Sequence, residues 1–183
     1  MAKLITNPQI KKVLKDCERE ECVEIILEMV EACPQAREFL TLKFTENHSE
    51  ILEKYKKRVR HEFYPTNGGF GNLRLKDAKK AIADFKKICP NKIMGIEIML
   101  FYVENCIEFT NDYGDINESF YNSAASVYSQ VVSEVNAAGL AVHEKFADRL
   151  RACVDDTSGI GWGFHDELYD LYLGLDWIDH ENE

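Results

Sequence analysis

Apolar residues recur with a helical period along nearly the whole chain, and the most apolar stretch runs from Ile93 to Phe109. At about 100° per residue, apolar side chains cover almost the entire circumference of a helix over this stretch. The only charged strip consists of Glu97, Glu104 and Glu108, called the acidic strip below. A helix with this pattern is buried among several neighbours. The sequence therefore predicts a central helix here, with the acidic strip as its solvent-facing edge.

Shorter amphipathic stretches flank this central helix on both sides. The predicted flanking helices cover approximately residues 7–17, 20–32, 34–44, 47–64, 75–88, 115–138, 142–153 and 164–175. We expect Asn7, Asn47 and Asp115 to act as N-caps, because each precedes a proline at the first helical position or a glutamate three residues later. No stretch shows the two-residue period of a strand. The pattern predicts an all-α fold, a compact bundle of about 8–9 helices.

The length of 183 residues matches one domain, and we expect a single all-helical domain over residues 1–183. Within it, residues 1–46 are predicted to form a helical hairpin or cap that packs on residues 47–176. A hydrophobic content of 45% and a charged content of 30% are typical of a folded globular protein. The N-terminus has no apolar leader, and glutamates interrupt the most apolar run. We therefore expect a cytoplasmic protein without a membrane partner.

Charge is distributed unevenly along the chain. Residues 1–92 hold 19 Lys and Arg against 14 Asp and Glu, whereas residues 93–183 hold 3 against 18. The segment 54–92 alone holds 12 basic and 3 acidic residues, a balance of +9. Its candidate basic patch consists of Lys54, Lys56, Lys57, Arg58, Arg60, Lys79 and Lys80. Such a segment could bind nucleic acid or a phosphate ligand, or could be an ordinary charged surface with i,i+4 ion pairs.

Two polar turns, 112–117 and 155–166, contain the residue types that a small-molecule site would need. His165 could act as an acid or base beside one of three carboxylates. Those carboxylates belong to Asp112, Asp155 and Asp156. The candidate ligand-binding residues are Tyr113, Asn117, Trp162 and Asp166. The alternative is structural, with capping residues and glycines that let the backbone turn. Antiparallel helices of similar length join the two turns, so we expect them to meet in space.

Metal and cofactor sites are not expected. No histidine has a glutamate three residues before it, and neither His61-Glu62 nor His143-Glu144 has the second histidine of H-E-x-x-H. The six cysteines have irregular spacing without a C-x-x-C pair, which favours reduced thiols over a zinc site or a disulfide framework. We therefore expect no metal and no cofactor.

Three segments carry a family resemblance: LKDAKKAIADFKK, YVENCIEFTNDYGDINESFYNS and DDTSGIGWGFHDELYDLY. In this order they resemble a family of bacterial all-helical proteins that is defined as a domain of unknown function. The resemblance extends from about Lys11 to Tyr172. It implies a helical fold and a bacterial cytosolic setting, and it assigns neither an activity nor catalytic residues.

The functional hypothesis from the sequence is a non-enzymatic protein-interaction or scaffold domain, with an unknown protein partner or self-association. Binding of nucleic acid or a phosphate ligand through residues 54–92 is the alternative. An enzyme or metal site built from Asp112, Asp155, Asp156 and His165 is a third option.

Overall fold

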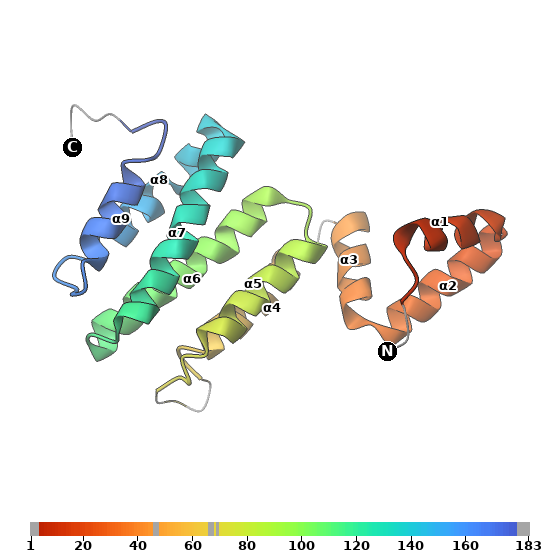
Figure 1. The fold of residues 1–183 in the computed structure, drawn as a ribbon, viewed down its shortest axis with the longest axis horizontal. Coiled ribbons are helices and arrows are strands. Elements are labelled where there is room, and N and C mark those ends of the chain that lie inside the picture. The colour runs from red at the N-terminus through yellow and green to blue at the C-terminus, as the bar shows by residue number, and fades with distance from the viewer. Residues whose placement is uncertain (1–3, 46–47, 66–67, 69, 179–183) are drawn as a thin grey trace. The chain divides into compact units, whose positions relative to one another are not determined.

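The computed structural model describes residues 4–45, 48–65, 68 and 70–178 (Figure 1). These residues form nine helices and no strand, which confirms the all-α prediction. The chain divides into two compact units, with the boundary between residues 46 and 47. We call them the N-terminal unit and the C-terminal unit and describe each by itself. No helix in the described residues is long and apolar enough to cross a membrane.

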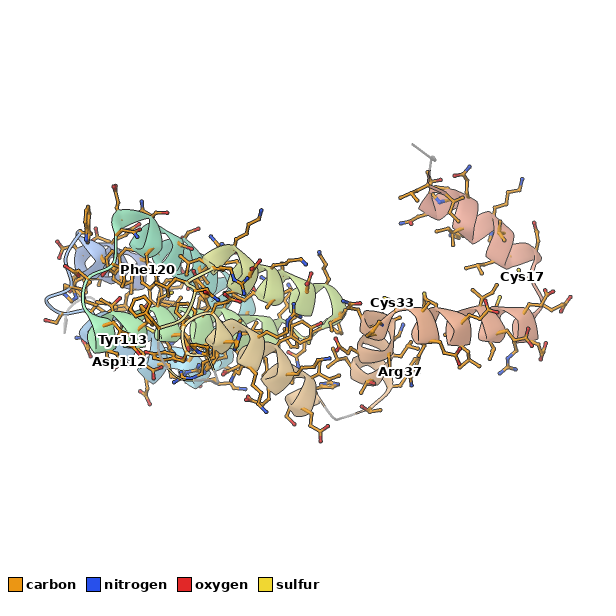
Figure 2. All side chains as sticks on the ribbon, turned by 90° about the horizontal axis from the view of Figure 1, so that it is seen from below. Cys17, Cys33, Arg37, Asp112, Tyr113 and Phe120 are labelled. Carbon is orange, nitrogen blue, oxygen red and sulfur yellow. The ribbon has the colours of Figure 1, made fainter. Side chains whose placement is uncertain are left out.

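The N-terminal unit has three helices: α1 (Asn7–Asp16), α2 (Arg19–Ala32) and α3 (Pro34–Phe44). α2 packs against α3, whereas α1 makes few contacts with either helix. Figure 2 shows α1 joined to the end of α2 near Cys17 and running back at an angle to it. Val30 and Leu42 are the only fully buried apolar residues among those described in this unit. The unit therefore has almost no core of its own.

The C-terminal unit has six helices. They are α4 (His48–His61), α5 (Leu75–Ile88), α6 (Lys92–Tyr113), α7 (Glu118–Ala138), α8 (Leu140–Asp155) and α9 (Phe164–Tyr172). α6 contacts α4, α5, α7 and α8, and α9 covers α7 and α8 (Figure 1). Twelve residues of α6 are buried. The prediction that this stretch forms the central helix is confirmed.

The helix starts differ from two of the expected N-caps. Thr6, not Asn7, caps α1, because the backbone N–H of Thr6 donates to Gln9 Oε1 at 2.9 Å and Asn7 already lies in the first turn. Asn117, not Asp115, caps α7, and its side chain accepts the Phe120 N–H at 3.0 Å. The third expected cap, Asn47, lies outside the described residues.

Gly71 lets the connection between α4 and α5 fold back on the end of α4. Its N–H donates to the carbonyl of Phe63 at 3.0 Å. A Cβ atom at this position would lie 2.2 Å from the carbonyl oxygen of Glu62. Only glycine allows so close an approach of two backbone segments. The closed connection places α5 beside α4, next to the central helix.

Candidate functional site

The acidic strip of α6 faces solvent only in part, because Glu108 is exposed whereas Glu97 and Glu104 are half-buried. Glu97 accepts from Lys56 of α4 at 2.7 Å and from Arg149 of α8 at 2.6 Å. The same guanidinium donates two hydrogen bonds to Glu104, at 2.7 and 2.9 Å. One carboxylate on α6 therefore binds cations from two helices, α4 and α8. The half-buried part of the strip therefore contributes to helix packing.

These contacts change the pKa values of Glu97 and Arg149. Burial alone would raise the pKa of Glu97, but hydrogen bonds from Arg149 and Lys56 hold that pKa below its ordinary value. For Arg149, burial would lower the pKa, and the hydrogen bonds to Glu104 and Glu97 more than offset this and raise it. Both groups are therefore charged at neutral pH. Their paired charges stabilise the contact between α6 and α8.

A second polar cluster joins α4 to the C-terminal half of α6. The Arg60 guanidinium donates to both carboxylate oxygens of Glu108, at 2.7 and 2.9 Å, and to the buried Asn105 at 2.9 Å. Its Cζ atom lies 4.5 Å from the ring centroid of Tyr64. The Tyr64 hydroxyl donates to Asp112 at 2.7 Å, and burial, together with this bond, raises the pKa of Tyr64. Asp112, a catalytic candidate, therefore already accepts a hydrogen bond in a structural cluster.

A hollow of about 410 Å³ lies between α6 and α8 beside this cluster. Its lining residues are Glu104, Ile107, Glu108, Asn111, Asp112, Arg149, Ala152, Cys153 and Asp156. Two of the predicted catalytic candidates, Asp112 and Asp156, lie in it. Burial raises the pKa of the Cys153 thiol, so this sulfur is protonated at neutral pH and is a poor nucleophile. The hollow combines carboxylates with an arginine that is already paired.

The two polar turns meet, as expected. Asn111, at the end of α6, donates its side-chain N–H to the carbonyl of Asp156 at 3.0 Å. The Gly161 N–H donates to Asp115 Oδ1 at 3.4 Å. A Cβ atom at Gly161 would lie 2.9 Å from the other oxygen of Asp115. The Asp115 carboxylate, which also accepts the Tyr121 hydroxyl at 3.1 Å, therefore connects the turns and is not a helix cap.

The predicted pairing of His165 with a carboxylate has no support in this geometry. Nδ1 of His165 lies 3.2 Å from the carbonyl of Val154 and 3.1 Å from Thr157 Oγ1. A carbonyl only accepts, so Nδ1 carries a proton in the bond to Val154. No carboxylate hydrogen-bonds to His165 within the part of the chain that the structure describes. Asp155 instead pairs with Arg151 at 3.1 Å. The acid–base role of His165 stays a prediction from the sequence.

The four predicted ligand-binding residues have different structural environments. Tyr113 is 46% exposed, and its ring lies 4.7 Å from that of Phe109. Asn117 caps α7, and Asp166 lies in the first turn of α9, where a negative charge favours the helix. Trp162 is 61% exposed and has φ of +63°, a left-handed conformation that is costly for a bulky residue. Ligand binding by these four residues stays a prediction.

The basic patch is partly neutralised by carboxylates of its own chain. Lys56 and Arg60 bind the acidic strip, and Arg58 lies 3.7 Å from Asp84. Lys54 has a partner as well. Among the described residues, the patch members without an ion pair are Lys57, Lys79 and Lys80. The patch therefore has fewer available charges than the count over residues 54–92 suggests.

Lys79 lines a separate hollow of about 390 Å³ over α6, between α5 and α7. Its floor includes Ile82, Met99 and Val127. Lys86 crosses from α5 to Glu134 of α7 at 2.6 Å, at one side of this hollow. This lysine is used structurally, like Lys56 and Arg60.

Sequence reasoning missed Arg149. A signal was present, because glutamates on a buried helix need cationic partners and residues 93–183 contain only 3 basic residues. Arg149 is one of these three. Its position on α8, 52 residues from Glu97, could not be read from local spacing.

Comparison with known proteins adds a family but no activity. No curated protein and no solved structure matches the chain. Residues 5–175 match the model of DUF6155, a family of unknown function. The match covers both units and nearly all of the described helices, in agreement with the resemblance of the three sequence segments. The chain therefore belongs to the DUF6155 family, a family of all-helical fold in this member and of unknown function.

Proposed function

We propose that this chain is a non-enzymatic protein-interaction or scaffold domain, and that α1–α3 of the N-terminal unit are its docking element. One observation carries the proposal. Of the sixteen large apolar side chains that are exposed in the described residues, twelve lie in residues 4–45. A concentration of exposed apolar side chains is characteristic of a surface that another protein covers.

The helices of this unit need another protein to bury their exposed apolar side chains in order to be stable. Isolated helices of about 12–15 residues are marginal in water, and most helical stability in proteins comes from burial of an apolar face. α2 has 14 residues and buries only Val30, while Ile25, Ile26 and Leu27 stay about half exposed. The C-terminal unit differs, because all the other fully buried apolar residues in the described part of the chain lie in it. A protein partner would supply the missing half of the N-terminal core.

Site-specific photo-crosslinking in cells tests the proposal. A photoreactive amino acid replaces Leu27, which is 57% exposed, and in a control variant it replaces Leu140, which is 49% exposed in the C-terminal unit. We expect a crosslinked protein at position 27 and none at position 140. Crosslinks from position 27 that reach only residues 47–183 of the same chain would overturn the proposal. That result would instead support the intrachain packing expected from the sequence.

Nucleic-acid or phosphate binding through residues 54–92 ranks lower, because Lys56 and Arg60 are paired with the acidic strip. It predicts salt-dependent binding of a labelled DNA duplex that is lost in the Lys57→Glu/Lys80→Glu variant. An enzyme built on His165 ranks below both, because its imidazole bonds to Val154 and Thr157 and not to a carboxylate.

A further inference from the structure

A groove follows α6 between α5 and α7, within the C-terminal unit. Both helices pack on α6, whereas they make few direct contacts with each other (Figure 1). Lys86 of α5 crosses this groove to Glu134 of α7 at 2.6 Å, and its ammonium lies 3.4 Å from the sulfur of Met99 on α6. The ion pair of Lys86 with Glu134 is called the bridge below. It separates two hollows of about 390 and 400 Å³.

The hollow of about 390 Å³, called the Lys79 hollow below, has an apolar floor and a basic rim. The floor consists of Ile82, Met99 and Val127, all of which belong to the buried core. The rim has three lysines of α5, namely Lys79, Lys86 and Lys87. Among the described residues, neither a carboxylate nor an aromatic ring lines this hollow. Its volume and its combination of apolar and polar lining are typical of small-molecule sites.

The rim has one positive charge that no carboxylate of the chain compensates. Lys86 is paired with Glu134, and Lys87 lies 3.6 Å from Asp84. Lys79 forms no ion pair with any residue that the structure describes. One uncompensated charge at the rim matches a ligand with a single negative charge.

A second polar group lines the Lys79 hollow from the facing helix. Gln130 of α7 donates one side-chain N–H to the carbonyl of Ser126 at 3.2 Å. An amide has two N–H donors, so the second donor of Gln130 remains for a ligand. Lys79 on one wall and Gln130 on the other can therefore donate to the two oxygens of one carboxylate.

We propose that the Lys79 hollow binds a medium-chain fatty acid, a monocarboxylate with an unbranched aliphatic body. The carboxylate accepts from Lys79 and Gln130, and the chain lies on the aliphatic floor. From Lys79 to the bridge, the wall formed by α5 is about 10 Å long, which limits the length of the chain. The site lies in the C-terminal unit and does not depend on the docking role proposed for α1–α3.

Other ligands fit this hollow less well. A partner helix is itself about 10 Å wide, and the bridge blocks its path along the groove. A phosphate group carries nearly two negative charges at neutral pH, more than the single uncompensated charge of Lys79. An aromatic body would find no aromatic ring to stack on among the described lining residues.

Methionine NMR on the 183-residue chain, labelled with methyl-¹³C methionine, tests the site. Met99 reports on the floor of the hollow, and Met94 on the same helix is an internal control that does not line it. During a titration with octanoate, we expect a saturable shift of the Met99 signal, with a Kd on the order of 100 μM. The Met94 signal should stay unchanged. Met99→Leu identifies the Met99 signal by its loss.

A ligand series separates the contributions of the chain and the carboxylate. Hexanoate should bind about tenfold more weakly than octanoate, because it buries two fewer CH₂ groups. Octanol has a chain of the same length without the charge and should also bind about tenfold more weakly. Octyl phosphate should bind no more tightly than octanoate. Equal binding of octanol, or tighter binding of octyl phosphate, would overturn the proposed carboxylate.

Three variants locate the site on the protein. Lys79→Met removes the charge but keeps an apolar stem, and it should weaken octanoate binding by about tenfold. Lys80→Met is the matched control, since Lys80 is exposed on the same helix but does not line the hollow, and the Kd should stay unchanged. Ala83→Phe fills the hollow from an exposed wall position and should abolish the saturable shift. Circular dichroism should show the same helix content in all three variants.

Three results would overturn the site. The first is the absence of a saturable Met99 shift with octanoate. The second is an equal loss of affinity in Lys79→Met and Lys80→Met, which would mean diffuse attraction by the basic segment. The third is unchanged octanoate binding by a folded Ala83→Phe variant.

Discussion

α2 and α6 are both helices whose apolar residues cover more than half of the circumference, yet their environments differ. α6 buries twelve residues, whereas α2 buries only Val30. α6 is preceded and followed by helices that fold back on it, while α2 has only α3 as a substantial neighbour. The comparison shows that an apolar sequence pattern predicts that a helix face needs to be buried. Whether this need is met within the same unit depends on the helices that neighbour that face. Within residues 4–45, taken by themselves, it is not met.

The largest expected effect comes from truncating a matched phenylalanine in each unit. Phe85 of α5 is fully buried against Tyr55, at 5.4 Å between ring centroids, while Phe44 of α3 is 74% exposed. Phe85→Ala should lower the free energy of unfolding by about 4 kcal/mol. Phe44→Ala should lower it by less than about 0.5 kcal/mol. Urea unfolding followed by circular dichroism measures both, and equal losses would mean that the units do not differ as described.

Removal of Arg149 tests the polar part of the C-terminal unit. Arg149→Met leaves Glu97 and Glu104 with less compensation, and we expect a loss of about 2 kcal/mol. This is less than for a fully buried pair, because the Arg149 side chain is 34% exposed. Lys145→Met on the same helix is the control and should change the free energy of unfolding by less than about 0.5 kcal/mol. If Arg149→Met left the free energy of unfolding unchanged, apolar packing alone would hold α8 on α6.

Trp162 is the position where the C-terminal unit most resembles the N-terminal one, because a large apolar side chain is exposed there. Its positive φ is costly for any residue with a Cβ atom. Trp162→Gly and Trp162→Ala both remove the indole, so their difference isolates the backbone cost. We expect the glycine variant to be more stable than the alanine variant by about 1 kcal/mol. Equal melting temperatures would contradict a strained backbone at this residue.

The smallest expected effect is a change in acid sensitivity. The folded-state pKa of Glu97 lies below that of an unfolded glutamate, about 4.3. The ionised carboxylate therefore stabilises the fold above that pH, and the contribution is lost as the pH falls below it. Glu97→Gln should lose less stability than the unmodified chain when the pH is lowered from about 6 to about 3. Urea titrations at both pH values measure this, with the exposed Glu144→Gln as the control, and parallel losses in all three proteins would exclude the effect.

The fold class, the central helix and most helix positions followed from the sequence, because period and burial are linked within each helix. Phe120, Ala124 and Val127 illustrate this, since their spacing along α7 alone predicted burial. The N-cap of α7 did not follow from the sequence, because Asp115 and Asn117 are both good caps. The choice depends on Tyr121 and Gly161, which occupy the Asp115 carboxylate only after the turns have met.

The candidate site was less predictable because its contacts are long-range. The meeting of the two turns followed from helix lengths, whereas the partners of the acidic strip lie 41 to 52 residues away along the chain. Periodicity identified a strip of like charge but gave no information about which cations reach it. The same limit applies to residues 1–46, where the pattern predicted that an apolar face is covered but not what covers it.

Glu97 binds Lys56 and Arg149 at the same time, so one carboxylate ties α4 and α8 to α6. Substitutions at these three positions should therefore be strongly non-additive, because once Glu97 is gone the two cations have lost a shared partner. A change at one position alters what is tolerated at the other two. In a lineage drifting under selection for folding, these three residues would be expected to change together, and their covariation would connect three helices that are distant in sequence.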